Sequence, residues 1–524
     1  MQMRKRLFSV LLIMAMVIGL MPVTAFAADG DVLSSSVSQF SDIPDNWSTV
    51  ALQNAVANGL LSGAGGKIMP NDNLTRSQMA TVIVRAFGAS VKGNLTGFSD
   101  IKSADWFADS MAKAFQMGVI KGSNGKMNPN NSITRQEVFV ILARAFKLQS
   151  ASTINNTFTD VSQISDWAKG EVYALVNAGY IQGANGKLDP GGLITRAEFA
   201  QTLDNILKQY VNKPGEITTV SAGNIMVNTS GVTLKNLTVS GDLIIGDGVG
   251  DGEVILDNVK VTGRMVVRGG GENSIIIRGS SSVSSVIVSR VDGTVSVKVE
   301  GDANVEIIYI DDGSDDVNIE GTVGNVEIKA PNIVVNAVGA TINNLDIAGA
   351  NSRIVIDANS SVNTVGVQQG ASNTTLQVAG TVTNITTAAA NTGISGSGTV
   401  TMVEAQAGAT GARIETPKTS IVVGAGVTGV TGGGGTAISG GTTTNNNATG
   451  TGTTTPAAPP PSGGGDGGSS NVAVSAINVT PTTMTLTAGG ATETITATVD
   501  PSNATHKSVT WSSSNEAVAT VVGA

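Results

Sequence analysis

One pattern of residues occurs three times near the start of this chain, and this repetition constrains the fold more than any other feature. Each copy runs from a Phe-x-Asp triplet through a tryptophan, two glycines and a proline to a Thr-Arg pair. Successive copies follow at about 60 residues, a fixed period of the kind that marks repeated modules. The spacing predicts three related units over residues 37–92, 95–150 and 155–212. Their Thr-Arg pairs are Thr75-Arg76, Thr134-Arg135 and Thr195-Arg196.

Each unit has the apolar spacing of two helices joined by a turn. In the first unit an apolar stripe follows Trp47, Gly59 ends it, and a second stripe follows Arg76. One helix pair cannot bury its own apolar face. We therefore expect the three units to pack on one another as an all-α bundle with pseudo-threefold symmetry.

The residues around each Thr-Arg pair suggest an anion site. Gln78, Glu137 and Glu198 follow the threonines by three positions, which predicts capping boxes. Capping does not explain the arginine, because a cation in the first helical turn opposes the helix dipole by roughly 0.3–1 kcal/mol. We interpret the arginine as acting with free N–H groups of that turn to bind a carboxylate or phosphate. A Gly-Lys pair before each arginine adds a second cation, at Lys67, Lys126 and Lys187.

Two further residues of each copy have both a structural and a binding interpretation. The tryptophan either fills the core or forms a platform on which a sugar ring stacks. The aspartate of the Phe-x-Asp triplet either caps a turn or helix, or accepts a hydrogen bond from a sugar hydroxyl. These residues are Trp47, Trp106 and Trp167, and Asp42, Asp100 and Asp160.

Residues 1–27 have the features of a secretory signal peptide. Arg4, Lys5 and Arg6 precede an apolar run, and Ala25-Phe26-Ala27 supplies a small-residue cleavage site. No later run of about 20 apolar residues follows, so we expect no membrane-spanning segment after cleavage.

The composition excludes several kinds of function. The formal net charge is −9, and removal of the three basic leader residues makes it −12. This charge argues against wholesale binding of nucleic acid or of an anionic membrane. The chain has no cysteine, and its one histidine is His506. Disulfides, thiolate chemistry and histidine-based catalytic or zinc sites are therefore excluded from the repeats.

Residues 218–430 consist of short Val- and Ile-rich segments at a period of about 20 residues, separated by Gly, Asn and Asp. Leu234-Lys235-Asn236, for example, recurs as Leu256-Asp257-Asn258. This pattern predicts a right-handed parallel β-helix, in which Val and Ile stack inward and Gly or Asn occupies corners that need positive φ. A β-sandwich is the alternative, although sandwiches rarely keep one period over such a length.

A β-helix can carry a polysaccharide lyase or hydrolase, which needs clustered carboxylates. The candidate cluster is Asp311, Asp312, Asp315 and Asp316, near Arg290 in the sequence.

A second acidic stretch, Asp247-Gly248 and Asp251-Gly252, resembles a calcium-binding turn, although such corners are usually plain turns. Tyr309 is the only Tyr or Trp of the β-helix segment, and a carbohydrate cleft normally needs stacking rings. We therefore expect a non-enzymatic spacer or display scaffold without a cofactor. The alternative is a polysaccharide lyase or hydrolase with its active site here or in a missing C-terminal part.

The remaining sequence divides into a linker and a β-domain. Residues 431–471 are rich in Gly, Thr, Asn and Pro, which predicts a disordered linker. Residues 472–524 alternate polar and apolar residues and contain Trp511, as expected of a partial all-β sandwich with a buried tryptophan. Residues 501–505 and 509–515 resemble the group 2 bacterial immunoglobulin-like domain, whose final strands are missing here.

The threefold pattern resembles the S-layer homology family, and Thr195-Arg196-Ala197-Glu198 matches its signature in letters. The resemblance implies a three-pronged helical bundle that holds a protein non-covalently on the bacterial cell wall. It implies binding of secondary cell-wall polysaccharide, which often carries pyruvate ketals, with peptidoglycan as the alternative partner. Arg76, Arg135 and Arg196 would meet the acidic group, and the tryptophans and aspartates would support it. We thus expect a secreted, structural or S-layer-associated protein of the cell wall.

Overall fold

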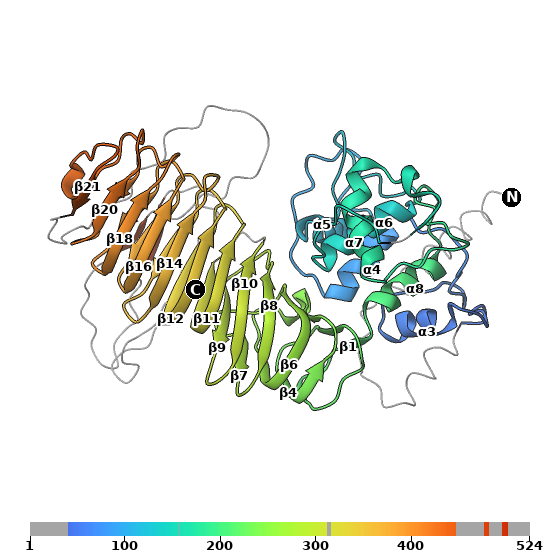
Figure 1. Cartoon of the computed structure of the whole chain (residues 1–524). Helices are drawn as coiled ribbons and strands as arrows, with labels where there is room; N and C mark the ends of the chain where they lie inside the picture. The colour runs from blue at the N-terminus through green and yellow to red at the C-terminus, as the bar shows by residue number, and fades with distance from the viewer. Residues whose placement is uncertain (1–39, 156, 312–315, 447–475, 481–494, 501–524) are drawn as a thin grey trace. The chain divides into compact units, whose positions relative to one another are not determined.

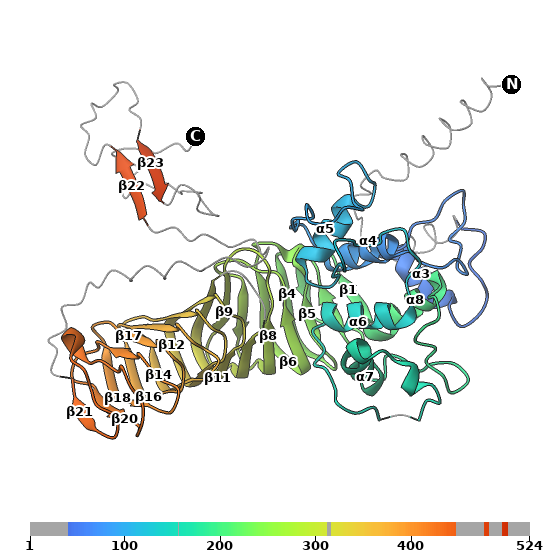
Figure 2. The same cartoon turned by 90° about the horizontal axis from the view of Figure 1, so that it is seen from above.

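The computed structural model describes residues 40–155, 157–311, 316–446, 476–480 and 495–500. The chain forms two compact units, Met1–Thr453 and Thr454–Ala524. The described part of the first unit is a helical bundle followed by a parallel β-helix (Figures 1 and 2). The predicted signal peptide lies outside the described residues.

The bundle contains two α-helices from each repeated unit. The second helix of every unit starts at the arginine of the Thr-Arg pair. No helix in the described residues has the length and apolar character needed to cross a membrane. The helices are α3 (Thr49–Ala57), α4 (Arg76–Phe87), α5 (Ala108–Gln116), α6 (Arg135–Ala145), α7 (Lys169–Asn177) and α8 (Arg196–Ile206), with 3-10 turns η1 (Val161–Gln163) and η2 (Asp166–Ala168) in the third unit.

Helices pack between units in a cycle. Helix α4 of the first unit contacts α5 of the second, α6 contacts α7 of the third, and α8 returns to α3 of the first. Each unit therefore completes its core with its neighbours, and the predicted pseudo-threefold bundle is confirmed. The apolar side chains between the helices, including Phe87, Phe139 and Phe199, are fully buried.

A ring of backbone hydrogen bonds closes the bundle at its axis. The N–H of Ile133 donates to Leu74 O at 3.0 Å, that of Ile194 to Ile133 O at 3.2 Å, and that of Leu74 to Ile194 O at 3.0 Å. All three side chains are fully buried. Because each of these residues immediately precedes a Thr-Arg pair, the ring fixes the three pairs relative to one another.

The β-helix contains the strands β1 to β21. Strands β1 to β20 pair in parallel from coil to coil, which confirms the parallel β-helix and excludes the sandwich. Equivalent residues of adjacent coils are 16 to 22 positions apart, close to the predicted period of about 20. The strands are β1 (Gln209–Val211), β2 (Gly215–Ile217), β3 (Ile225–Val227), β4 (Val232–Val239), β5 (Leu243–Ile245), β6 (Val254–Val267), β7 (Ile275–Arg278), β8 (Ser282–Val288), β9 (Val295–Val299), β10 (Asn304–Ile310), β11 (Val317–Ile328), β12 (Val334–Ile347), β13 (Arg353–Ile356), β14 (Ser361–Val367), β15 (Thr375–Val378), β16 (Thr381–Thr387), β17 (Gly393–Ser395), β18 (Thr399–Ala405), β19 (Arg413–Ile414), β20 (Ser420–Val423) and β21 (Thr443–Asn445).

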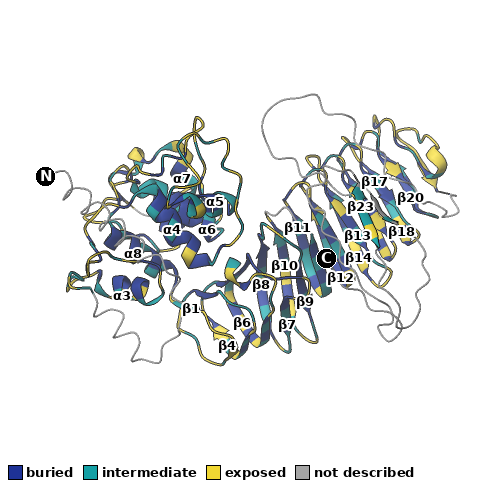
Figure 3. Ribbon diagram, turned by 180° about the vertical axis from the view of Figure 1, so that it is seen from behind, coloured by how far each residue is buried: buried dark blue, intermediate teal, exposed yellow. Residues whose placement is uncertain are grey.

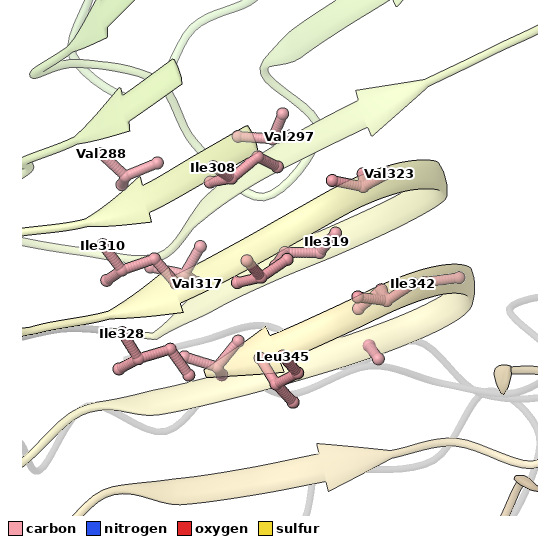
Figure 4. Packing of buried hydrophobic residues seen from close by; sticks show 14 of the residues in the cluster. Val288, Val297, Ile308, Ile310, Val317, Ile319, Val323, Ile328, Ile342 and Leu345 are labelled. Carbon is pink, nitrogen blue, oxygen red and sulfur yellow. The ribbon is translucent and has the colours of Figure 1, made fainter. Parts of the chain in front are cut away.

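The interior of the β-helix is a stack of aliphatic side chains. Val288, Ile310 and Ile328 occupy the same position in successive coils and lie one above another, as Figure 4 shows. The buried residues alternate along the strands with exposed or half-buried ones (Figure 3). A β-branched side chain repeated at one position fits this pleated, stacked surface well.

Asparagine residues form a second ladder at one corner. Asn332, Asn351, Asn373 and Asn391 all have φ between 57° and 60°. The side-chain amide of each later member donates to the amide oxygen of the one before it at 3.0 Å. Asparagine tolerates the left-handed conformation and bonds to its stacked neighbour, so the predicted use of asparagine at corners is confirmed.

Side chains of the first coils cap the three second helices of the bundle. The last carbonyls of a helix have no partner within it, and here the β-helix supplies the donors. The bonds are Asn228 Nδ2 to Ala86 O of α4 at 3.3 Å, Arg264 Nη2 to Phe146 O after α6 at 3.3 Å, and Asn224 Nδ2 to Ile206 O of α8 at 2.7 Å.

An apolar strip of the β-helix is buried under these helix ends. Met226, Ile244, Val266 and Ile287 stand at one outward position of four successive coils and join the core of the bundle. The bundle and the β-helix therefore share a continuous packed and hydrogen-bonded interface.

The β-helix is longer than predicted at both ends. It begins at Gln209, inside the predicted third unit, because β1 pairs with β3. It continues beyond residue 430, where a linker was predicted, because β21 pairs antiparallel with β20 and Asn446 is buried. The side chain of Asn446 donates to the carbonyls of Ile414 and Thr416 at 3.0 and 2.7 Å. The sequence predicted a linker here because the segment has few apolar residues. Backbone pairing, which does not require apolar side chains, holds the segment instead. Residues 447–471 lie outside the described residues.

The described part of the second unit is one antiparallel pair, β22 (Ala476–Thr480) and β23 (Thr496–Asp500). This pairing agrees with an immunoglobulin-like sandwich. Trp511, predicted to be buried, lies outside the described residues.

We expect Gly321→Ala to destabilise the β-helix more than Gly339→Ala. Both glycines have positive φ, at 82° and 55°, so both substitutions incur the backbone cost of about 1–2 kcal/mol. Only at Gly321 would the new Cβ meet a backbone atom, Val299 O, at 1.8 Å, whereas nothing lies within 4 Å at Gly339. Urea unfolding of the two variants measures the difference, and equal midpoints would contradict this account.

Candidate functional site

The three Thr-Arg turns are built alike. The backbone N–H of each threonine donates to the side chain of the residue three positions later, at 3.1 Å in the first copy and 2.9 Å in the other two. The predicted capping boxes are confirmed. They orient the first turn of α4, α6 and α8, where the arginines stand.

The first-turn N–H groups are not free, contrary to our interpretation from the sequence. The N–H of Arg76 donates to Asn131 O at 3.0 Å and that of Ser77 to Pro129 O at 3.0 Å. The same two bonds recur from Arg135 and Gln136, and from Arg196 and Ala197, to the loop of the next unit in the cycle. The loops satisfy these donors, so any ligand at this edge must meet side chains instead.

Each arginine reaches across to the next unit in the cycle. Its Nε donates to the carbonyl of the residue that follows the lysine of the Gly-Lys pair. The partners are Met127 O for Arg76 at 3.0 Å, Leu188 O for Arg135 at 2.8 Å and Ile68 O for Arg196 at 2.7 Å. The arginine thus clamps two units together, which accounts for a cation at an electrostatically unfavourable helix position.

The three arginines differ in their charged partners. Arg76 forms an ion pair with Glu137 at 2.8 Å, and Arg135 forms one with Glu198 at 2.9 Å. Gln78 occupies the equivalent position for Arg196, which makes no ion pair within 4 Å among the described residues. The sequence reasoning treated these N3 side chains as caps and missed their second role. The repeated Arg and Glu of the signature would have been the signal.

Arg196 is also the most buried of the three. It is 8% exposed, and its Nη2 donates to Ser62 O at 2.8 Å. Burial lowers the pKa of this arginine, while Asp72 and Asp42 nearby act to raise it. These two carboxylates offset part of its charge without pairing with it directly.

The three lysines stand at the exits of tight turns beside the arginines. Ala64 and Lys67, Ser123 and Lys126, and Ala184 and Lys187 form short antiparallel bridges. Both central residues of each turn have positive φ, as in a type I′ hairpin turn. All three lysines are exposed. Because each precedes the carbonyl that an arginine contacts, arginine and lysine share one edge between two units.

We call these places the inter-unit sites and define each by its arginine, its lysine and the N3 residue that faces the arginine. Site 1–2 consists of Arg76, Lys126 and Glu137; site 2–3 of Arg135, Lys187 and Glu198; and site 3–1 of Arg196, Lys67 and Gln78.

The three aspartates support the loop that carries the lysine. Both oxygens of Asp160 accept backbone N–H groups, from Leu188 at 2.9 Å and Asp189 at 2.7 Å. Asp42 and Asp100 bind the equivalent residues of their own units. The turn-capping interpretation therefore explains these residues, and their carboxylate oxygens are already engaged.

The three tryptophans are exposed. The exposed fractions are 61% for Trp47, 52% for Trp106 and 54% for Trp167. The interpretation as core residues is wrong, because the neighbouring phenylalanines and helix residues fill the core. Three exposed indoles at equivalent positions are compatible with the binding interpretation, which stays a prediction.

Among the described residues, the acidic candidates of the β-helix do not gather into a metal site. Arg290 pairs with Asp251 at 2.5 Å rather than with the Asp311 cluster, and Arg268 pairs with Asp247 at 2.8 Å. Both carboxylates of the supposed calcium turn are therefore bound by arginines. In the described residues no three acidic or histidine side chains gather as metal ligands. Asp312 and Asp315 lie outside the described part of the chain.

Comparison with known proteins identifies the repeated units. Residues 39–80, 97–139 and 157–200 match the S-layer homology domain. The three units are S-layer homology domains. Residues 473–524 match the bacterial Ig-like domain (group 2).

The relatives include both S-layer proteins and enzymes. The chain is 30% identical over 41% of its length to the Surface-layer 125 kDa protein of Lysinibacillus sphaericus, and 28% over 37% to the S-layer protein sap of Bacillus anthracis. It is 32% identical over 34% of its length to Exoglucanase XynX of Acetivibrio thermocellus. The matches span 19%, 24% and 17% of these relatives. The domains and S-layer relatives indicate a secreted protein of the cell wall or S-layer.

We expect Asp160→Asn to destabilise the bundle by about 1–3 kcal/mol at pH 7, because an amide cannot accept both backbone N–H groups. Burial raises the pKa of Asp160, but the bonds from Leu188 and Asp189 outweigh it and leave the pKa below 3.8. The stability that the carboxylate contributes is present above its ordinary pKa and is lost as the pH falls through the lowered one.

The difference in unfolding free energy between this variant and the wild type should therefore shrink as the pH falls below 3.8. Denaturant unfolding at several pH values measures it. Asp45→Asn, at an exposed residue, is the matched control and should behave like the wild type. A pH-independent difference would contradict the role of the charge.

Proposed function

We propose that the chain is a non-enzymatic surface protein, held on the cell wall because its inter-unit sites bind an acidic secondary cell-wall polysaccharide. The observation that carries the proposal is the pairing of a preoriented arginine and an exposed lysine at each boundary between units. A planar guanidinium held by carbonyls on one edge can offer its remaining N–H groups to a carboxylate in fixed geometry. The β-helix and the C-terminal unit would then be displayed from this anchor.

The exposed tryptophans supply the second part of the proposal. An indole stacks favourably on the apolar face of a pyranose ring. Trp47, Trp106 and Trp167 would contact sugar rings of the polymer while the cations meet its acidic groups. Pyruvate ketals would provide such acidic groups, and peptidoglycan is the alternative polymer.

Site 3–1 differs from the other two sites because no N3 carboxylate pairs with its arginine, although Arg196 is the most buried of the three arginines. Arg76 and Arg135 each share their charge with a glutamate at under 3 Å, and a bound anion would have to compete with it. The equivalent N3 residue of site 3–1 is Gln78, which completes the capping box of α4 without a negative charge. Because the first unit has Gln78 where the other two have glutamate, it should favour anion binding at Arg196 of the third unit.

Exchanging the N3 residues tests whether their charge affects binding. We expect Gln78→Glu to weaken binding to cell-wall sacculi by about 1 kcal/mol, or roughly fivefold, and Glu137→Gln to strengthen it by a similar factor. Both residue types form the capping box in this chain, so both variants should fold. Co-sedimentation with purified sacculi at low ionic strength measures the affinities. Opposite shifts support the proposal, whereas no shift in either variant would count against charge as the determinant.

Replacing the three tryptophans by alanine should reduce sacculus binding by at least about tenfold while leaving the unfolding midpoint unchanged, because the indoles are exposed. Val50→Ala, at another exposed apolar residue of the bundle, is the control. Hydrofluoric acid treatment, which strips secondary polysaccharide from sacculi, should abolish binding of the wild type. Binding that survives stripping would identify peptidoglycan as the partner instead.

The enzymatic alternative places a lyase or hydrolase site on the β-helix or in a further C-terminal part. Enzymes among the relatives support it, but among the described residues no three acidic or histidine side chains gather as metal ligands. Cleavage of wall polysaccharide by the purified chain would establish it.

A further inference from the structure

Two of the three tight turns that carry the lysines contain an Asn-Gly pair. The turn of the second unit has Asn124-Gly125 at its centre, and that of the third unit has Asn185-Gly186. The first unit has Gly65-Gly66 at the same two positions. Asparagine and glycine both tolerate the positive φ of these positions, which is 51° at Asn124 and 59° at Gly65. The turn itself therefore does not require asparagine.

An Asn-Gly pair can deamidate without an enzyme, which is one reason why asparagine is a thermolabile residue. The backbone nitrogen of the glycine loses its proton and attacks the side-chain carbonyl carbon of the asparagine. A cyclic imide forms, and the side-chain nitrogen leaves as ammonia. Water then opens the imide at one of its two carbonyls and gives aspartate or isoaspartate. In sum, one water is consumed, one ammonia is released, and a neutral amide becomes a carboxylate.

The reacting groups of both turns are accessible. Asn124, Gly125, Asn185 and Gly186 are all exposed. Within the described residues, neither glycine nitrogen donates a hydrogen bond and neither asparagine side chain forms one. The bonds at the glycines are made by their carbonyls, which accept from Ser99 N at 2.9 Å and from Thr159 N at 3.0 Å. Nucleophile and amide are therefore both free to react.

The turns also have room to rearrange. The glycine nitrogen reaches the side chain only when the turn opens briefly, and one pair of backbone bonds closes each turn, at 2.8 and 3.0 Å in the second unit and 2.8 and 2.9 Å in the third. A Cβ added at Gly186 would meet nothing within 4 Å, and one at Gly125 would meet only Gly97 O, at 3.5 Å. Little packing therefore opposes the opening of either turn.

The third Asn-Gly pair of the sequence is an internal control. Asn58-Gly59 follows α3, and both of its reacting groups are engaged. The N–H of Gly59 donates to Val56 O at 2.9 Å, and Asn58 Nδ2 donates to Asn54 O at 2.9 Å. Asn58 is also half-buried. Since the end of the helix must unravel before this pair can react, it should deamidate much more slowly than the pairs in the two turns.

The new carboxylates would stand at two of the three inter-unit sites. Asn124 precedes Lys126 of site 1–2 by two residues, and Asn185 precedes Lys187 of site 2–3 by two. A negative charge there opposes the binding of an acidic ligand. Site 3–1 cannot acquire this charge, because Gly65 stands at the equivalent position.

We infer that Asn124 and Asn185, but not Asn58, are sites of spontaneous deamidation, and that the reaction weakens the binding of an acidic polymer at sites 1–2 and 2–3 and not at site 3–1. The second half of this inference rests on the proposed function, whereas the first half does not. Two separate measurements therefore test the two halves.

The first measurement follows the chemistry alone. The mature full-length chain is aged in mildly alkaline buffer, and peptide mass spectrometry with enzymatic methylation of isoaspartate quantifies the conversion of each asparagine. Asn124 and Asn185 should convert while Asn58 is retained, and the rate should rise with pH because the glycine nitrogen attacks in its deprotonated form. Equal conversion of all three, or none at the two turns, would overturn the first half.

The second measurement follows binding to sacculi that carry secondary polysaccharide, by co-sedimentation at low ionic strength. The aged wild type should bind about fivefold more weakly than the fresh protein. Asn124→Gly with Asn185→Gly copies the turn of the first unit, so this variant should fold and keep its affinity through the same ageing. Asn124→Asp with Asn185→Asp should bind as weakly as the aged wild type from the start. Equal unfolding midpoints verify that the variants fold.

The outcomes separate this inference from the proposed function. Unchanged affinity of the aged wild type despite conversion of both turns would overturn the second half and leave the anchor in place. Equal loss of binding in the aged double glycine variant would assign the loss to another change and would overturn the second half as well. Fresh wild type that fails to bind sacculi would overturn the proposed function together with the second half, while mass spectrometry would still decide the first.

Discussion

The backbone ring of Leu74, Ile133 and Ile194 is the constraint on which the rest of the bundle depends. Each residue donates to one neighbour and accepts from the other, so the ring exists only when all three units are present. The threonine cap and the arginine follow in the next two positions of every unit. The ring therefore sets where each arginine starts, and the first-turn bonds to the neighbouring loop set its direction.

The arginines have a structural role between units, and the proposed function gives the same side chains a binding role as well. A lysine could not do this, because its ammonium lacks the planar fork that lets Arg76 bond Met127 O and Glu137 at once. Donors held in place before a ligand arrives lose less conformational entropy on binding. In the proposed function the N3 residue adjusts the charge available to the ligand, and Gln78 is the variation that this chain offers.

Much of the architecture could be predicted because it is periodic. Helix spacing, the capping residues and the repeated Val and Ile positions all act over short stretches of sequence, and each was found where the pattern placed it. The asparagine corners followed from the conformational tolerance of that residue, as at Asn351 and Asn373. The ends of the β-helix were predicted wrongly, because a strand can pair with a neighbouring coil without having an apolar composition.

The candidate site was less predictable, since it depends on contacts between units. Spacing alone does not say whether Trp106 points inward, and only the packing of Phe107 and Met111 shows that the core is already filled. Nor does a sequence reveal that the carboxylate of Glu137 serves an arginine of another unit as well as its own helix. The interface with the β-helix was missed altogether, because Asn224, Asn228 and Arg264 resemble ordinary corner residues.

Because the coils stack in register, the length of the β-helix is set by the number of its repeats. Neighbouring strands lie about 4.8 Å apart, so the insertion or loss of one repeat would move everything beyond it by that increment. The coils that touch the bundle, up to β10, would be unaffected by changes further along. Evolution could thus alter the distance between the wall anchor and the end of the β-helix in equal steps without redesigning either.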